Sequence, residues 1–186
     1  MTRIVAGLAK GRRLSVPQRG TRPTSDRARE AMFNTLRAHL DLEGARVVDL
    51  FAGSGAVGLE ALSRGAAASV LVESDRAAAD VILRNIAAVG LPGAVLHRRT
   101  AESFLAEDGP DAPFHLAFAD PPYTYPDEQL AGLLVALADG RWLADRAVVV
   151  VERSARAAEP PWPEGIALVT QRQYGEGALW YGRDQP

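Results

Sequence analysis

The chain has 186 residues, of which 47% are hydrophobic and 24% charged, which suits one domain with a substantial buried core. It has no cysteine and only three histidines, far apart in sequence, which excludes a disulfide framework and argues against a metal site. No apolar run is long enough to cross a membrane and no signal-peptide pattern opens the chain, so we expect a cytoplasmic protein without a membrane partner.

The net charge of -2 conceals a strong asymmetry along the chain. Residues 1–40 have nine basic residues against two acidic ones, a net charge of +7, whereas the remainder has a net charge of −9. A basic segment on an acidic body suits a phosphate-backbone partner, although a solvated basic tail would have the same composition. We therefore treat residues 1–40 as an N-terminal extension that binds RNA and residues 41–186 as the body. The candidate RNA contacts are Arg3, Lys10, Arg12, Arg13, Arg22, Arg27 and Arg29.

The extension should contain a hairpin and a helix. Two short β-like runs, 3–7 and 12–16, predict a hairpin with basic edges. A helix is expected to begin near Thr24 or Ser25, because Asp26 then lies in the first turn, where the helix dipole favours a carboxylate. Arg29 falls on the apolar side of this helix, so its side chain either reaches past the core to solvent or faces a cleft.

From residue 46 onward, strands and helices alternate, which predicts a parallel α/β sheet. The expected strands are 47–50, 69–72, 94–97, 114–119 and 147–151, and the expected helices are 59–64, 75–89 and 127–138. Two antiparallel strands, 167–173 and 178–182, close the chain through a turn at 175–177. Ligands of open α/β sheets bind beyond the carboxyl ends of the strands, so we expect the functional residues in the loops that follow them.

A glycine loop follows the first of these strands. Residues 53–58 fit G-x-G-x-x-G, and Glu73 lies 20 residues after Gly53, where a dinucleotide site keeps its ribose-binding acid. The loop alone therefore leaves an NAD-dependent oxidoreductase open. Asp49, however, lies four residues before Gly53, and a carboxylate so close to the loop suits a cationic ligand better than a pyrophosphate. S-adenosylmethionine has an ammonium and a sulfonium and no phosphate, so it fits this arrangement.

A second motif, Asp120-Pro121-Pro122-Tyr123, follows the strand expected at 114–119. The prolines end the strand and hold a rigid bend, because they fix φ and have no N–H. The Asp120 carboxylate and the Pro121 carbonyl can accept the two N–H groups of an exocyclic amino group and turn its lone pair toward an electrophile, while Tyr123 stacks on the base. The four residues alone describe a plain turn after a strand equally well.

Together these motifs resemble a known class of enzymes. The residues 49–55 and 120–123 are similar to those of class I S-adenosylmethionine-dependent methyltransferases that modify amino groups. Further runs resemble RsmD-type 16S rRNA guanine-N2 methyltransferases, at 3–7, 11–14, 22–34 and 51–65. The resemblance covers nearly the whole chain and is weakest from 155 to 165. It implies an α/β, Rossmann-like fold with a seven-stranded, mostly parallel sheet, an antiparallel C-terminal strand and an N-terminal hairpin-and-helix extension.

The resemblance also implies a monomer that methylates a guanine, at position 966 of 16S rRNA, in the small ribosomal subunit or its assembly intermediate. The implied catalytic residues are Asp120, Pro121, Pro122 and Tyr123. The implied cofactor-binding residues are Asp49, Phe51, Gly53, Ser54, Gly55, Glu73, Ser74, Thr100, Ala101 and Asp120, with no metal. DNA adenine methylation remains open, because the same four-residue motif serves both amino groups, and a non-enzymatic RNA-binding module is a third class.

Overall fold

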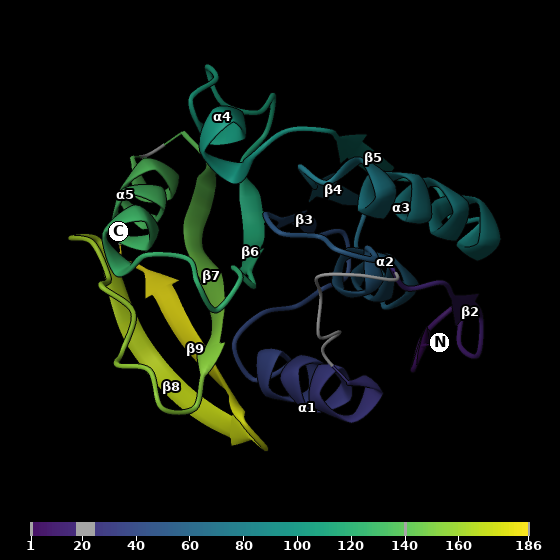
Figure 1. Cartoon of the computed structure of the whole chain (residues 1–186), viewed down its shortest axis with the longest axis horizontal. Helices are drawn as coiled ribbons and strands as arrows, with labels where there is room; N and C mark the ends of the chain where they lie inside the picture. Colours follow the sequence, from purple (N-terminus) through teal and green to yellow (C-terminus); the bar gives the residue numbers. More distant parts are fainter. Residues whose placement is uncertain (1, 18–24, 140, 186) are drawn as a thin grey trace.

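The computed structural model describes residues 2–17, 25–139 and 141–185. The extension consists of β1 (Thr2–Arg3), β2 (Arg13–Leu14) and α1 (Asp26–Leu36). The first half of the body consists of β3 (Arg46–Asp49), α2 (Ala56–Ser63), β4 (Ala68–Val72), α3 (Arg76–Val89) and β5 (Ala94–His97). The second half consists of α4 (Ala101–Leu105), β6 (Phe114–Ala119), α5 (Asp127–Ala138), β7 (Leu143–Ser154), β8 (Ile166–Tyr174) and β9 (Gly177–Asp184) (Figure 1).

The sheet has seven strands in the order β5-β4-β3-β6-β7-β9-β8. Strands β3, β4, β5, β6 and β7 run parallel to one another, whereas β9 runs antiparallel to both β7 and β8. This confirms the expected mostly parallel sheet with an antiparallel C-terminal strand. The chain leaves the sheet's centre in one direction through β4 and β5 and returns through β6, so β3 and β6 flank the point where ligands of such sheets bind.

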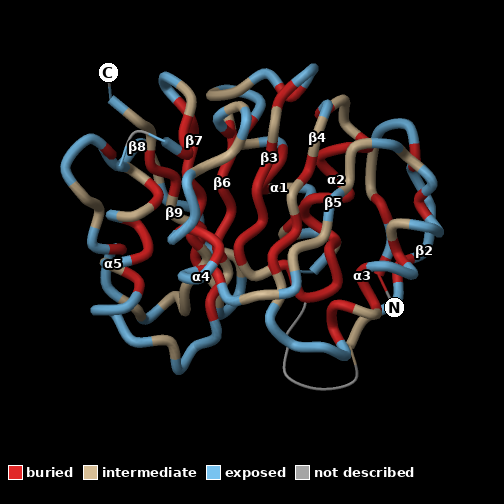
Figure 2. Tube along the Cα trace, turned by 90° about the horizontal axis from the view of Figure 1, so that it is seen from above, coloured by how far each residue is buried: buried red, intermediate tan, exposed pale blue. Residues whose placement is uncertain are grey.

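Both faces of the sheet are covered, which explains why its central strands read as continuous apolar runs. Helices α1, α2 and α3 pack on one face, and α4 and α5 pack on the other (Figure 1). Successive strand residues alternate between the two cores: Val47 and Leu116 lie in one, Val48 and Ala117 in the other. Figure 2 shows β3, β6 and β7 buried along most of their length. Within the described ranges, no helix has the length and apolarity needed to cross a bilayer.

The helix boundaries follow local capping signals. The Ser25 hydroxyl accepts a hydrogen bond from the Ala28 amide at 3.1 Å, so α1 begins where the sequence predicted. Asp75 caps α3 in the same way, through the Ala78 amide at 2.8 Å. Helix α2 begins three residues earlier than predicted, because Gly55 adopts φ 77° and turns the glycine loop directly into the helix.

The extension shares its hydrophobic core with the body. The predicted hairpin is confirmed, although its paired strands are shorter than expected, and Thr2 pairs with Leu14. Ile4 and Leu14 are fully buried in the same core cluster as Phe33 of α1 and Val47 of β3. Removing the hairpin would therefore open the core, so the extension is not an independently folding unit.

A buried ion cluster fastens the extension to α2. Glu60 has no exposed surface and accepts hydrogen bonds from the Val5 amide at 2.8 Å and the Ala6 amide at 3.0 Å. Its carboxylate also pairs with Arg64 at 2.8 Å and with Arg29 at 3.4 Å. Four donors thus compensate one buried charge, as such a charge requires.

This cluster corrects the prediction that Arg29 contacts RNA. The Arg29 side chain is 0% exposed, and besides Glu60 it pairs with Asp26 at 3.1 Å and donates to the backbone carbonyl of Arg3. Its guanidinium is drawn into the core by two carboxylates and is not accessible to a polyanion. The position on the apolar side of α1 therefore serves a structural purpose.

We expect Arg29→Met to lower the free energy of unfolding by about 3–5 kcal/mol, because it removes one of the two arginines that pair with the buried Glu60 carboxylate. The control is Arg98→Met, which breaks an ion pair with Asp80 whose side chains are 45% and 49% exposed and should cost less than about 1 kcal/mol. Urea unfolding followed by circular dichroism measures both. A loss for Arg29→Met no larger than for Arg98→Met would contradict the structural importance of the cluster.

Candidate active site

The predicted cofactor and base residues meet at one edge of the sheet. Strands β5, β4, β3 and β6 are consecutive neighbours and run parallel, so their carboxyl ends lie side by side. All the residues expected to bind the cofactor and the target base lie at the carboxyl ends of these four strands or directly after them. In order across the sheet they are Thr100 and Ala101, Glu73 and Ser74, Asp49 to Gly55, and Asp120 to Tyr123.

The glycine loop is tied to the second strand of the sheet by Glu73. The Glu73 carboxylate accepts the Gly53 amide at 2.8 Å through one oxygen and the Asp75 amide at 2.7 Å through the other. One acid therefore fixes both the loop and the start of α3, while its own side chain stays half-buried at the rim. Gly58 allows α2 to pack closely on β4, since a Cβ there would lie 2.3 Å from Ser69 Oγ and 2.4 Å from the Leu71 side chain, which would have to shift.

The Asp49 carboxylate is buried, and a positively charged ligand would compensate its charge. It ends β3 with 1% of its surface exposed, and its Oδ1 has no hydrogen-bond partner in the part of the chain described. Burial raises the pKa of Asp49 to about 7; the charge of Glu73 adds to this rise, and the backbone amides of Phe51 and Gly58 oppose it. An ammonium bound in the glycine loop would satisfy the orphaned oxygen, so these residues fit the cationic end of the predicted cofactor.

Asp120 is the second acid at this edge whose surroundings disfavour the charged form. Burial raises the pKa of Asp120 well above its ordinary value, and the nearby charges of Glu152 and Asp49 raise it further. Strand register explains this proximity, because Asp49 pairs with Phe118 and Ala119 pairs with Val151 across neighbouring parallel strands. Within the described ranges, no three His, Asp or Glu side chains are placed to hold a metal ion.

The residues after Asp120 form a bend with one exposed aromatic ring. Pro121 is buried, the Pro122 carbonyl accepts the Tyr125 amide at 2.8 Å, and the Tyr123 side chain is 61% exposed. An exposed ring beside Asp120 is free to stack on a base. Tyr125 is held in place instead, packing edge-on against Phe51 with ring centroids 5.4 Å apart.

The sequence did not identify two side chains at this edge, those of Tyr125 and Glu152. The Tyr125 hydroxyl donates to the Glu102 carboxylate, and burial together with that carboxylate raises the pKa of Tyr125. This bond connects α4 to the segment that follows β6. Glu152 was missed because β7 extends to Ser154 through pairing with β9, whereas the local apolar pattern ends at residue 151. Its proximity to Asp120 depends on strand order, which no short motif signals.

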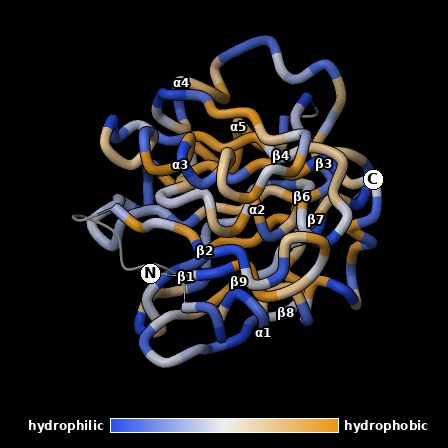
Figure 3. Tube along the Cα trace, turned by 90° about the vertical axis from the view of Figure 1, so that its right-hand side faces the viewer, coloured by the Kyte–Doolittle hydropathy of each residue, from blue (hydrophilic) through white to orange (hydrophobic). Residues whose placement is uncertain are grey.

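The hairpin carries exposed basic residues and is bonded to the glycine loop. Arg3, Lys10, Arg12 and Arg13 are exposed, as is Arg27 on α1, whereas Arg22 lies outside the described residues. In Figure 3, hydrophobic residues gather in the centre of the molecule and hydrophilic ones on its periphery.

Asn85 of α3 makes the link between hairpin and loop. It is buried, accepts the Ser15 amide at 2.8 Å, and donates to the carbonyls of Ser15 at 2.9 Å and Ser54 at 2.8 Å. The sequence offered no signal for this contact, because the three residues are far apart along the chain.

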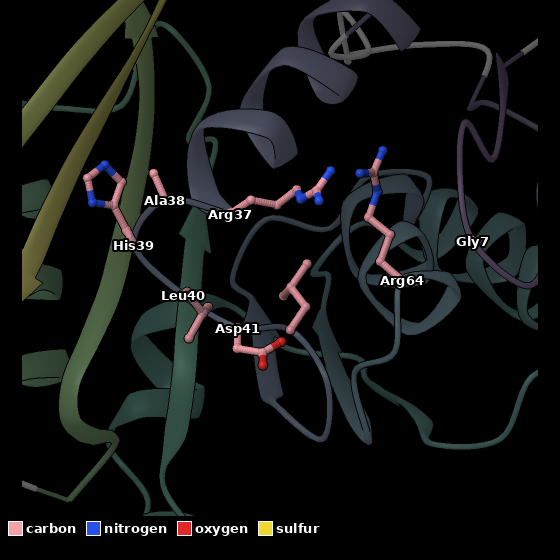
Figure 4. A pocket seen from close by; sticks show the side chains of 8 residues that line it. Gly7, Arg37, Ala38, His39, Leu40, Asp41 and Arg64 are labelled. Carbon is pink, nitrogen blue, oxygen red and sulfur yellow. The ribbon is translucent and has the colours of Figure 1, made fainter.

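A pocket of about 710 Å³ lies at the opposite edge of the sheet, before β3 begins and after α2 ends (Figure 4). Its lining consists of Gly7, residues 37–42 and Arg64. None of the predicted cofactor or base residues lines it, so it is separate from the candidate active site.

Comparisons with known proteins agree with this arrangement. The profile of the family described as "Conserved hypothetical protein 95" matches residues 2–183. The chain is 40% identical to "Ribosomal RNA small subunit methyltransferase D" of Escherichia coli, over 95% of this chain and 86% of that one. It is 33% identical to the protein of the same name in Haemophilus influenzae, over 81% and 77% of the two chains. The solved structure of yhhF from Escherichia coli superposes with a TM-score of 0.86 at 38% identity, over 98% and 97% of the chains.

The pKa of Asp49 predicts how stability depends on pH. Between its usual value of 3.8 and about 7, Asp49 is protonated only in the folded state, so the free energy of unfolding falls as the pH rises through this window. Asp49→Asn removes the titrating group and should make the decline between pH 5 and pH 8 shallower. Urea unfolding at several pH values measures it, with exposed Asp145→Asn as control. Equal pH dependence in the wild type and Asp49→Asn would refute the assignment.

Proposed function

Since the chain belongs to the family described as conserved hypothetical protein 95, we propose that it is an S-adenosylmethionine-dependent methyltransferase acting on the RNA of the small ribosomal subunit. Its target in this proposal is the exocyclic N2 amino group of a guanine. The observation that carries the proposal is the placement of Asp120-Pro121-Pro122-Tyr123 at the same sheet edge as Asp49 and the glycine loop. The name shared by the Escherichia coli and Haemophilus influenzae relatives supports the RNA substrate.

The cofactor end of the site would use acids and backbone. Asp49, with its orphaned oxygen, would hold the ammonium of the cofactor. Glu73, half-buried at the end of β4, would bind the ribose hydroxyls, and the glycine loop would allow close backbone approach. Thr100 and Ala101, at the start of α4, would lie beside the adenine. The bound cofactor supplies an electrophilic methyl group.

The base end of the site would orient the amino group. The target base must leave its stack, because the residues that bind it lie in a site a continuous helix cannot enter. The Asp120 carboxylate and the Pro121 carbonyl would accept the two amino N–H groups and turn the nitrogen lone pair toward the methyl group, while Tyr123 stacks on the ring. Positioning of this kind accounts for most of the expected rate enhancement.

The raised pKa of Asp120 predicts that the cofactor binds before the target base. Asp120 accepts its amino hydrogen most strongly as a carboxylate, and its burial beside Glu152 and Asp49 opposes ionisation. A positive charge held by Asp49 lowers the pKa of Asp120 and favours the accepting form. Cofactor binding should therefore precede productive binding of the base.

We expect the purified protein to incorporate labelled methyl groups as N2-methylguanosine when given small ribosomal subunits or their assembly intermediates. Nuclease digestion and mass spectrometry identify the product and its position, with free rRNA and duplex DNA as parallel substrates. Asp120→Ala should abolish turnover and leave cofactor affinity nearly unchanged by calorimetry, whereas exposed Asp145→Ala should retain both. Methylated adenine from DNA would favour the alternative amino substrate, and tight NAD binding without cofactor binding would favour the oxidoreductase.

The exposed basic residues of the hairpin should contribute RNA affinity. Replacing Arg3, Lys10, Arg12 and Arg13 by Gln keeps Ile4 and Leu14 in the core, so this test avoids deleting the hairpin. The slope of log affinity against log salt should flatten by up to about 3 units if all four contact single-stranded phosphates.

A charge-matched control for this experiment replaces four exposed arginines elsewhere, Arg141, Arg146, Arg156 and Arg172, by Gln. Filter binding of the subunit RNA over a range of salt concentrations gives both slopes. If the two fourfold variants lose the same affinity and slope, the hairpin is no more than a solvated basic surface.

A further inference from the structure

Glu152 lies beside Asp120 at the carboxyl edge of the sheet. Strands β6 and β7 are parallel, and Ala119 pairs with Val151, so Asp120 and Glu152 are the next residues at corresponding positions. Corresponding residues of neighbouring parallel strands project from the same face, about 4.8 Å apart along the hydrogen-bonding direction. Asp120 and Glu152 are therefore at neighbouring backbone positions at the end where the base is expected, and the charge of Glu152 acts on Asp120.

The surroundings of Glu152 hold it at this edge. It pairs with Leu179 across β7 and β9 and is half-buried. A Cβ at Gly177 would lie only 3.3 Å from Glu152 Oε1, so the glycine that begins β9 leaves the room this side chain occupies. Two neighbouring charges raise the pKa of Asp120, and that of Glu152 has the larger effect.

Guanine and adenine differ at the position adjacent to the amino group. In guanine, N2 is next to an N1–H, so the Watson–Crick edge presents donors side by side. In adenine, the N6 amino group is next to N1, which has a lone pair and accepts. Enzymes that extrude a base read it through hydrogen bonds on this edge. Two adjacent carboxylates complement the donors of guanine and repel the lone pair of adenine.

We propose that Glu152 accepts the N1–H of the target guanine while Asp120 holds its amino group, so that Glu152 selects guanine over adenine. This inference rests on the proposed function, and it deepens that function by naming the residue that reads the base. Asp120-Pro121-Pro122-Tyr123 binds any exocyclic amino group, and discrimination comes from the neighbouring strand β7. A site built around a substrate N–H disfavours a base that lacks it, because the carboxylate then faces a lone pair instead of a donor.

The test compares guanine with 2-aminopurine, which keeps the 2-amino group but has an unprotonated N1. Small-subunit RNA is prepared with either base at the methylated position and assembled into subunits. Wild-type protein should methylate the guanine substrate about 10- to 100-fold more efficiently in kcat/KM, the range for one hydrogen bond to a charged group. In Glu152→Gln, an amide that can also donate faces the base, so the preference should shrink by about 10-fold.

The matched control is Glu164→Gln, an exposed glutamate between β7 and β8, which should keep the wild-type preference. The ratio of the two substrates isolates base reading, because a general loss of stability or of cofactor affinity lowers both rates together. An equal preference in wild type and Glu152→Gln, or no preference in wild type, would overturn the assignment of Glu152. Absence of N2-methylguanosine from the wild-type reaction would instead overturn the proposed function, and with it this inference.

Discussion

The buried carboxylate of Glu60 is the constraint on which the arrangement of the extension depends. It accepts two hairpin amides and pairs with Arg29 of α1 and with Arg64 at the end of α2, so three elements meet at one charge. A buried ionic group of this kind fixes relative position because any shift leaves a charge uncompensated. The basic hairpin is thereby presented as a rigid surface, and Asn85 connects that surface to the glycine loop.

A second group of acids, Asp49 and Asp120, lies at the carboxyl ends of β3 and β6, where the ligand is expected to bind. Asp49 and Asp120 are held beside each other with raised pKa values, and Asp49 Oδ1 has no partner within the described residues. Holding these acids close together in a buried place lowers the free energy of unfolding, and a cationic ligand that compensates their charge binds more tightly as a result. Strongly shifted pKa values are common at functional sites for this reason. The contrast with Glu60 shows that a buried carboxylate stabilises the fold where its donors belong to the protein and is available for binding where its donors come from a ligand.

Local patterns in the sequence predicted much of this fold because they reflect local physics. The strand at 114–119 and the helix at 127–138 were predicted with the bounds they have, and the cap at Ser25 marked the start of α1. The glycine loop and the Asp120 motif located the ends of two adjacent strands, β3 and β6. The rest depended on pairing across the chain: β9 lengthens β7 and brings Glu152 into the site, and Glu60 buries Arg29 from 31 residues away.

The position of β9 has a consequence for synthesis of the protein. Strand β9 is made after β7 and β8, yet it lies between them, and among the described residues β8 pairs with no other strand. While the ribosome is still holding the C-terminal residues, β7 has one open edge and β8 has two. Unpaired edges recruit other strands. A chain truncated before residue 177 would keep them open permanently, so such a truncation should yield aggregation rather than a slightly shortened enzyme.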